Sequence, residues 1–300
     1  MKSLAKLSCA LLLAGLATAA SAQQGTLDKI RASGAITLGH RDSSIPFSYL
    51  DDNRKPIGYA MELCDRIVDA VKTELKLPNL KVNYQPVTSA TRIPLLANGT
   101  IDLECGSTTN NAERQKQITY TITHFVTANR FVSKKSSNIN ALADLKGKTV
   151  VSTSGTTNIK QITEINAAQN LGINILPAKD HAEAFLMVDT GRAVAFVMDD
   201  ILLAGLVANH ANPGLFTISK DALSVEPYGI MLRREDPAFK AVVDKAMTQI
   251  YTSGEIKAIY SKWFEKPIPP RGINLNIPMG DSFKRVVAKP TDSPDPNVYN

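Results

Sequence analysis

Short apolar, β-branched runs alternate along the chain with longer segments of helical periodicity, and this alternation limits the possible folds more than any other feature. Strands that alternate with helices usually form a largely parallel sheet with crossover helices, so we expect an α/β protein. We expect strands at 35–39, 80–86, 100–105, 130–133, 148–152, 173–176, 193–197 and 228–232. We expect helices at 27–32, 58–76, from 88 onward, and at 157–170, 180–190, 199–209, 236–252 and 254–265.

The first 22 residues have the organisation of a secretory signal peptide. Lys2 and Lys6 precede an apolar run at 7–20, and Ala20-Ser21-Ala22 is a small-residue cleavage site. Cys9 lies too early to be a lipid-modified cysteine, and no later run reaches the roughly 18 apolar residues that a membrane span needs. We therefore expect a secreted product that is not anchored to a membrane.

Removal of this segment takes away two lysines, which lowers the formal net charge from +6 to +4. About 278 residues remain, enough for two packed domains. No Lys/Arg block with interleaved aromatic residues suggests a nucleic-acid surface, and a small positive balance suits an acidic ligand. The end of the chain after about 288 is rich in Pro, Asp and Asn, and we expect it to be loosely ordered.

Two cysteines, Cys64 and Cys105, remain in the mature chain. Cys64 lies on the apolar face of an expected helix and Cys105 in an expected buried strand, so both are core positions. The sequence does not give the Cα separation that decides whether a disulfide forms, and it favours two buried thiols. No Cys/His cluster suggests a metal site, and we expect no cofactor.

The segment 104–114 carries the clearest candidate site. Gly106 ends the expected strand, and Ser107, Thr108 and Thr109 then offer hydroxyl and backbone N–H donors. Arg114 adds a planar, five-donor guanidinium that suits a carboxylate. The alternative interpretation is a helix N-cap followed by a surface arginine.

Further polar residues lie just past the carboxyl ends of expected strands, where open α/β sheets bind ligands. The pattern Leu-x-x-Gly-x-Ile at 96–101 has a looser echo, Val-x-x-Gly-x-x-Val, at 188–194, and each leads into a strand that ends at such a residue. The residues in such positions are Arg41, Ser107, Thr156, Thr157, His181 and Asp199.

Three other motifs suggest chemistry less strongly. Gly147-Lys148-Thr149 lacks the upstream glycine of a phosphate loop. The run 154–157 lacks a nucleophile elbow and fits an anion-binding helix N-terminus better. Asp180 and His181 are either acid–base groups or part of an exposed helix start.

Eight segments together carry a family resemblance that runs to about residue 277. They are similar to the periplasmic glutamate/aspartate-binding proteins of bacterial ABC amino-acid importers, within solute-binding protein family 3. In order, the segments are HRDSSIPFSY, GYAMELCDRIVDAV, SATRIPLLANGTIDLECGSTTNNAERQKQ, DLKGKTVVSTSGTT, AKDHAEAF, GRAVAFVMDD, EPYGIMLRRED and SGEIKAIYSKWF.

The resemblance implies a two-lobed, type II periplasmic binding protein fold with two hinge strands near 127–128 and 226–228. Lobe 1 would comprise 27–127 plus 229–277, lobe 2 would comprise 128–228, and 278–300 would be a C-terminal extension. The implied function is capture of L-glutamate or L-aspartate in the periplasm by a monomer that is not an enzyme and delivers its ligand to an inner-membrane ABC permease.

The resemblance also assigns roles to individual residues. Arg114 would hold the ligand α-carboxylate, and Asp199 would take the α-ammonium. The remaining roles are α-carboxylate contacts for Ser107, Thr109 and Thr157, and side-chain carboxylate contacts for Arg41 and Arg92, supported by Ser89 and His181. The sequence departs from the family at Ile230, where relatives have Cys, and at Cys64, which they lack.

Charge complementarity supports these roles. A dicarboxylic amino acid carries two negative groups and one positive, and a neutral one would leave a buried arginine without a partner. Two alternatives remain: a dehydratase-like enzyme on this fold, with Glu104 or His181 as the acid, and a receptor module, which would need a membrane span after the lobes.

Overall fold

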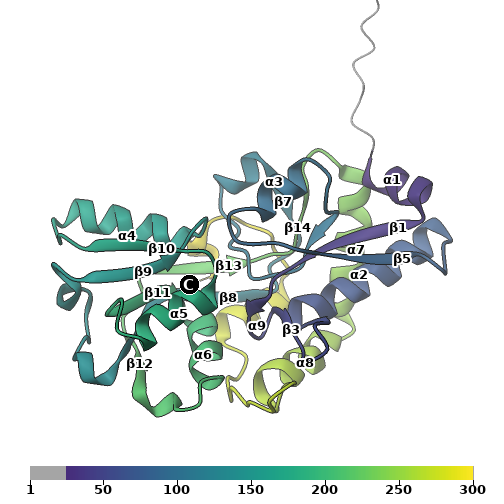
Figure 1. Cartoon of the computed structure of the whole chain (residues 1–300). Helices are drawn as coiled ribbons and strands as arrows, with labels where there is room; N and C mark the ends of the chain where they lie inside the picture. Colours follow the sequence, from purple (N-terminus) through teal and green to yellow (C-terminus); the bar gives the residue numbers. More distant parts are fainter. Residues whose placement is uncertain (1–24, 300) are drawn as a thin grey trace, which may run out of the picture.

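The computed structural model describes residues 25–299, so the expected signal peptide lies outside the described residues. Figure 1 shows two α/β lobes, each built on its own sheet. The expected α/β class and the two-lobed architecture are confirmed. Among the described residues, no helix is long and apolar enough to cross a membrane.

The first lobe is built on a five-stranded sheet in the order β5-β1-β6-β14-β7. Strand β1 pairs in parallel with β5 and β6, whereas β14 is antiparallel to β6 and β7. The strands are β1 (Ala35–His40), β5 (Lys81–Pro86), β6 (Leu103–Glu104), β7 (Ile118–Tyr120) and β14 (Met231–Arg233), and a small ribbon holds β2 (Ser43–Ser44), β3 (Ser48–Leu50) and β4 (Pro56–Ile57).

Helices flank this sheet, and α2 packs against α7. They are α1 (Thr26–Ser33), α2 (Tyr59–Leu75), α3 (Arg92–Ala97), α7 (Pro237–Thr252) and α8 (Glu255–Tyr260), which continues as a π-helical turn at Ser261–Glu265. The apolar positions of α2 that predicted a helix, from Cys64 to Leu75, are its buried face.

The second lobe is built on a six-stranded sheet in which β10, β9, β11, β8 and β12 follow one another and β13 also pairs with β8. Its strands are β8 (Phe125–Lys134), β9 (Thr149–Thr153), β10 (Asn174–Ala178), β11 (Ala195–Asp199), β12 (Phe216–Ile218) and β13 (Ser224–Tyr228). Helices α4 (Thr157–Ala168), α5 (His181–Asp189) and α6 (Asp200–Ala208) follow β9, β10 and β11.

Strands β8 and β13 join the two lobes, and we call this antiparallel pair the connecting ribbon. Within it, Glu226 pairs with Thr127 and Val225 with Ala128. The predicted single strand at 228–232 is wrong: β13 ends at Tyr228 and β14 begins at Met231. Gly229 lies at the break, where an added Cβ would be 2.9 Å from the Tyr120 ring.

The preferred interpretation of the cysteines is also wrong, because Cys64 and Cys105 form a disulfide. Their Cα atoms are 6.2 Å apart, a separation that a disulfide spans. Ile230 is fully buried.

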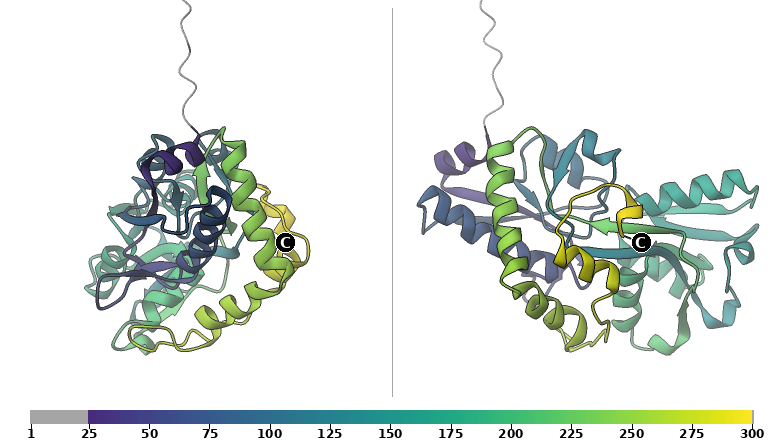
Figure 2. Two further views of the ribbon diagram at one scale, coloured as in Figure 1. Left: turned by 90° about the vertical axis from the view of Figure 1, so that its right-hand side faces the viewer. Right: turned by 180° about the vertical axis from the view of Figure 1, so that it is seen from behind.

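The C-terminal extension is ordered, contrary to the expectation of a loose tail. It forms α9 (Asp281–Ala288) and a short 3-10 turn at Pro296–Tyr299, and Figure 2 shows it lying across the back of the molecule over β8. The Tyr299 hydroxyl lies 2.8 Å from Thr123 Oγ1, and the Thr123 N–H donates to the Thr291 carbonyl. A buried aromatic residue near the end of the chain, Tyr299, therefore fastens a segment whose composition predicted disorder.

Candidate functional site

A small polar cavity of about 10 Å³ lies between the lobes, roughly the space of one water molecule. Its lining contains seven of the nine residues expected from the sequence. The lining residues are Ser89, Arg92, Ser107, Thr109, Thr156, Thr157, Asn158, His181, Met198, Asp199 and Leu202.

The other two expected residues lie directly beside this lining. Arg41 Nη2 is 3.4 Å from His181 Nε2, and Arg114 Nη1 donates to the carbonyl of Thr109 at 2.9 Å. The structure therefore brings all nine residues together, from both lobes.

Chain direction explains this convergence. Arg41 directly follows β1, Asp199 is the last residue of β11, and His181 and Thr157 are the first residues of α5 and α4. Thr156 is the N-cap of α4, and its side chain accepts a hydrogen bond from the Ile159 N–H. The carboxyl ends of parallel strands and the helix starts that follow them point into the same cleft.

Arg41 and Arg92 are buried side by side in the first lobe, each about 2% exposed. Arg92 Nη1 lies 2.5 Å from Thr108 Oγ1 and 3.7 Å from Glu104 Oε1. Burial lowers the pKa of Arg92 to about 10, with Glu104 acting in the opposite direction, and burial also lowers the pKa of Arg41. Arg41 Nη1 and Arg92 Nε have no hydrogen-bond partner, and neither do the hydroxyls of Ser89 and Ser107.

Arg114 reaches across the cleft. Its Nη2 donates to the Gly155 carbonyl of the second lobe at 3.2 Å, and its Nη1 donates to Thr109 of the first lobe. The interpretation of Arg114 as a solvated surface arginine is therefore wrong, because only 8% of the residue is exposed.

Asp199 is the principal buried anion of the second lobe's side of the cleft. Its Oδ1 accepts a hydrogen bond from Asn158 at 2.7 Å, and its Oδ2 accepts one from the Tyr228 hydroxyl. Burial and the neighbouring Glu226 carboxylate raise the pKa of Asp199 to about 7, while the two hydrogen bonds act against the shift. The group is thus poised to titrate near neutral pH.

His181 is a buried, neutral ring. Its Nδ1 lies 2.8 Å from Thr153 Oγ1, and burial together with Arg41 and Arg92 lowers its pKa. The neighbouring Asp180 caps α5 by accepting from the Glu183 N–H, so the two residues do not form an acid–base pair. The expectation of an exposed helix start is wrong for His181, which is 1% exposed.

The lobes are in contact around the cleft. Gly155 has a φ of +76°, and a Cβ there would be 2.6 Å from the Ala90 Cα of the first lobe. On α6, a Cβ at Gly205 would be 2.5 Å from the Ile45 carbonyl oxygen. At the rim, Lys160 of α4 pairs with Glu113 at 2.5 Å. The structure is therefore a closed form.

Sequence reasoning missed the residues that surround Asp199. Asn158 is the second residue of α4. Its position at the expected anion-binding helix start was the only sequence signal that could have placed it in the site. Glu226 and Tyr228 belong to a segment expected to be a hinge, but only the register of β13 with β8 shows that they reach the cleft.

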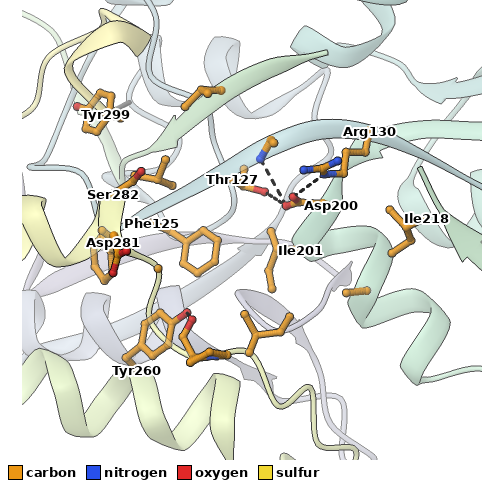
Figure 3. A pocket seen from close by; sticks show the side chains of 18 of the residues that line it. Phe125, Thr127, Arg130, Asp200, Ile201, Ile218, Tyr260, Asp281, Ser282 and Tyr299 are labelled. Carbon is orange, nitrogen blue, oxygen red and sulfur yellow. Dashed lines mark hydrogen bonds and ion pairs between the residues drawn. The ribbon is translucent and has the colours of Figure 1, made fainter. Parts of the chain in front are cut away.

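A second and larger hollow, of about 710 Å³, lies on the other face of the connecting ribbon (Figure 3). Neighbouring residues of a strand point to opposite faces. Glu226 reaches Thr157 of the cleft, whereas Val225 and its partner Ala128 line this rear hollow.

Both lobes and the C-terminal extension supply the walls of the rear hollow, which are largely apolar. Asp200, at its polar edge, accepts hydrogen bonds from Thr127 and Arg130 (Figure 3). Unpartnered donors of Arg41, Arg92, Ser89 and Ser107 lie at the cleft instead. Within 25–299 no cluster of His, Cys, Asp or Glu could hold a metal ion.

Comparison with known proteins finds close relatives. Residues 36–266 match the family of bacterial extracellular solute-binding proteins, family 3. The chain is 55% identical, over 89% of both chains, to the L-glutamate/L-aspartate-binding protein of Pseudomonas aeruginosa, and 47% identical, over 94% of both chains, to the glutamate/aspartate import solute-binding protein of Escherichia coli K12.

One solved structure among the similar ones bears on the enzyme alternative. It is an ancestral amino acid-binding protein described as a precursor of cyclohexadienyl dehydratase. The TM-score is 0.67 at 28% identity, and the match covers 80% of this chain and all of that one.

Proposed function

Because the chain belongs to family 3 of the bacterial extracellular solute-binding proteins, we propose that it captures L-glutamate or L-aspartate between its lobes in the periplasm and delivers it to an ABC permease of the inner membrane. The observation that carries the proposal is a set of four buried donor groups without a partner. They belong to Arg41, Arg92, Ser89 and Ser107, and all four face the space between the lobes or lie against its lining.

Buried polar atoms in folded proteins nearly always have hydrogen-bond partners, so four donors orphaned in one place call for a ligand rich in acceptors. Each carboxylate offers two acceptor oxygens and a full negative charge. Arg41 Nη1, Arg92 Nε and the Ser89 hydroxyl would hold the side-chain carboxylate, with neutral His181 fixing the Arg41 guanidinium.

The α-carboxylate would lie between Arg114, Ser107 and the start of α4. Arg114 gives two of its five donors to the carbonyls of Thr109 and Gly155, which leaves three for a ligand. Thr157 is the first residue of α4, where free backbone N–H groups and the helix dipole favour an anion.

The α-ammonium would lie against Asp199. Asn158 and the Tyr228 hydroxyl hold this carboxylate in place, and an ammonium among three arginines needs an anion. The cleft thus offers sites for two negative groups and one positive group.

The proposed lobes are 27–127 plus 229–277 and 128–228, with the hinge in the connecting ribbon and 278–300 as a C-terminal extension. The disposition of the sheets supports these boundaries, because β14 belongs to the first sheet and β13 to the second. We propose that the protein works as a monomer, because both halves of the site come from one chain.

We propose binding without catalysis. The dehydratase-like alternative has support in the similarity to the dehydratase precursor. The two candidate acids argue against it: Glu104 is fully buried with Oε2 bound by Thr108, and His181 is held neutral.

Isothermal calorimetry with the twenty amino acids tests the proposal. We expect saturable, one-site binding of L-glutamate, L-aspartate or both, with much weaker binding of neutral and cationic amino acids. Incubation with a prephenate-like substrate should give no product. Tightest binding of a neutral amino acid, or turnover of the dehydratase substrate, would contradict it.

A further inference from the structure

Glu104 is a buried carboxylate next to the two arginines assigned to the ligand side chain. We propose that it sets the net charge of this subsite at one positive unit, so that the subsite selects side chains with a single negative charge. The inference rests on the proposed function and deepens it.

Glu104 lies near both arginines. Its Oε2 accepts a hydrogen bond of 2.6 Å from Thr108, whose hydroxyl also contacts Arg92 Nη1. Its Oε1 has no hydrogen bond and lies 3.7 Å from Arg92 Nη1. A Cβ added to Gly106 would lie 2.3 Å from that oxygen and 3.3 Å from Arg41 Cγ, so the Glu104 carboxylate is also near the Arg41 side chain, whose pKa it raises.

The nearby charges can be counted. Among the groups buried at this subsite, Arg41 and Arg92 contribute two positive charges, Glu104 removes one, and the His181 ring is neutral. Arg114 is assigned to the α-carboxylate, and Asp180, which also raises the pKa of Arg41, is partly exposed. Glu104 is also the strongest influence that raises the pKa of each of these buried arginines. One positive charge therefore remains for the ligand side chain, which matches one carboxylate.

The charge of the ligand side chain should then affect affinity independently of its shape. Charges in a water-poor site interact far more strongly than in water, so a dianionic group would meet Glu104 as an uncompensated like charge. Removing the negative charge of Glu104 leaves two positive charges, which suit a dianion better.

Two ligands of matched shape separate charge from size. O-phospho-L-serine and L-serine O-sulfate have the skeleton of glutamate and the same tetrahedral end group. The phosphate is close to dianionic at pH 8, because its second pKa is about 6, whereas the sulfate carries one charge. The ratio of their dissociation constants reports the charge preference.

We expect the wild-type protein at pH 8 to bind the sulfate ester at least tenfold more tightly than the phosphate ester. Glu104→Gln should move this ratio at least tenfold toward the phosphate ester. Thr108→Val, which breaks the hydroxyl bridge but keeps the Glu104 charge, should lower both affinities and leave the ratio within threefold. Glu74→Gln, the loss of an exposed charge on α2, should leave it unchanged.

A ratio that stays within threefold in Glu104→Gln, or shifts equally in Thr108→Val, would overturn the inference. If the cleft accepts neither ester, the preference for glutamate over glutamine serves instead. The ratio of the glutamate affinity to the glutamine affinity should rise at least tenfold in Glu104→Gln. If that variant does not fold, the wild type can be measured at pH 8 and at pH 5.5, where the phosphate ester carries close to one charge. The affinity for the phosphate ester should then approach that for the sulfate ester, and an unchanged ratio of dissociation constants would count against the inference.

Failure of the proposed function has a different signature. Wild-type protein that binds neither glutamate nor aspartate refutes the function before any ratio is measured. Tight glutamate binding with unchanged ratios refutes only the role of Glu104.

Discussion

Acidification should weaken ligand binding through Asp199, at a pH well above that at which an ordinary aspartate titrates. Burial, followed by Glu226, raises the pKa of Asp199 to about 7, and Asp200 on α6 adds to the shift. Hydrogen bonds from Asn158 and Tyr228 stabilise the ionised form of Asp199, but they do not cancel the upward shift of its pKa. Because a ligand ammonium needs the carboxylate ionised, binding must displace a proton.

The size of the effect follows from this competition. With a pKa of about 7, the apparent dissociation constant should rise by a factor of about 2 at pH 7 and about 30 at pH 5.5, relative to an alkaline limit. Without ligand, the folded state of Asp199 holds its proton to a higher pH than the unfolded state. This group's contribution to stability therefore falls as the pH rises from about 4 through 7.

Isothermal calorimetry with glutamate between pH 5.5 and 8.5 gives the affinity profile. Repeating it at pH 7 in two buffers of different ionisation enthalpy should show release of about half a proton. Asp199→Asn should weaken binding by about 2–5 kcal/mol, or roughly 30- to 5,000-fold, and remove most of the pH dependence. A wild-type affinity that is flat over this range, or full affinity in Asp199→Asn, would refute the reasoning.

Four further outcomes can be checked on the wild type and on selected variants. Arg92→Met should weaken glutamate binding about 30-fold or more and glutamine binding much less, measured by calorimetry, because it removes a charge-assisted contact to the side-chain carboxylate. Small-angle scattering should show compaction of the wild type on adding glutamate, whereas Gly205→Val should compact less because its side chain meets the other lobe. The rear hollow lies behind the connecting ribbon, so we expect it to narrow as the cleft opens; Ala204→Phe, which fills it, should therefore raise glutamate affinity in calorimetry. Joint replacement of Cys64 and Cys105 by alanine should lower the free energy of unfolding by about 2–4 kcal/mol in denaturant titrations.

Local pattern was enough to predict the α/β class and most of the cleft residues, whereas the two-lobed fold and the roles of Ser89 and Arg92 came from the family resemblance. The apolar face of α2 and the β-branched runs are short-range signals, so the α/β alternation could be read directly. Arg41, Thr157 and Asp199 were found because each lies at a strand end or helix start, and parallel strands carry such positions to one edge.

Contacts between distant segments were not predictable in the same way. The Cys64–Cys105 disulfide depends on how α2 lies on its sheet, and the burial of Tyr299 depends on Thr123, 176 residues earlier. Likewise, Tyr228 reaches Asp199 only because of the strand register in the connecting ribbon. Neither composition nor periodicity predicts the distance between residues that are far apart in the sequence.

The balance of contacts in the closed form indicates why closure should depend on the ligand. Lys160 and Glu113 form an exposed ion pair, worth about 0–1 kcal/mol, and Arg114 adds one hydrogen bond to Gly155 across the cleft. Against these gains, each buried donor without a partner costs about 1–3 kcal/mol, and Arg41, Arg92, Ser89 and Ser107 each hold one. Closure over an empty cleft thus costs more than these two contacts gain. In the closed form a dicarboxylate satisfies those donors and also meets Asp199 and the start of α4 on the second lobe. Because these second-lobe contacts need closure, they shift the population toward the closed form.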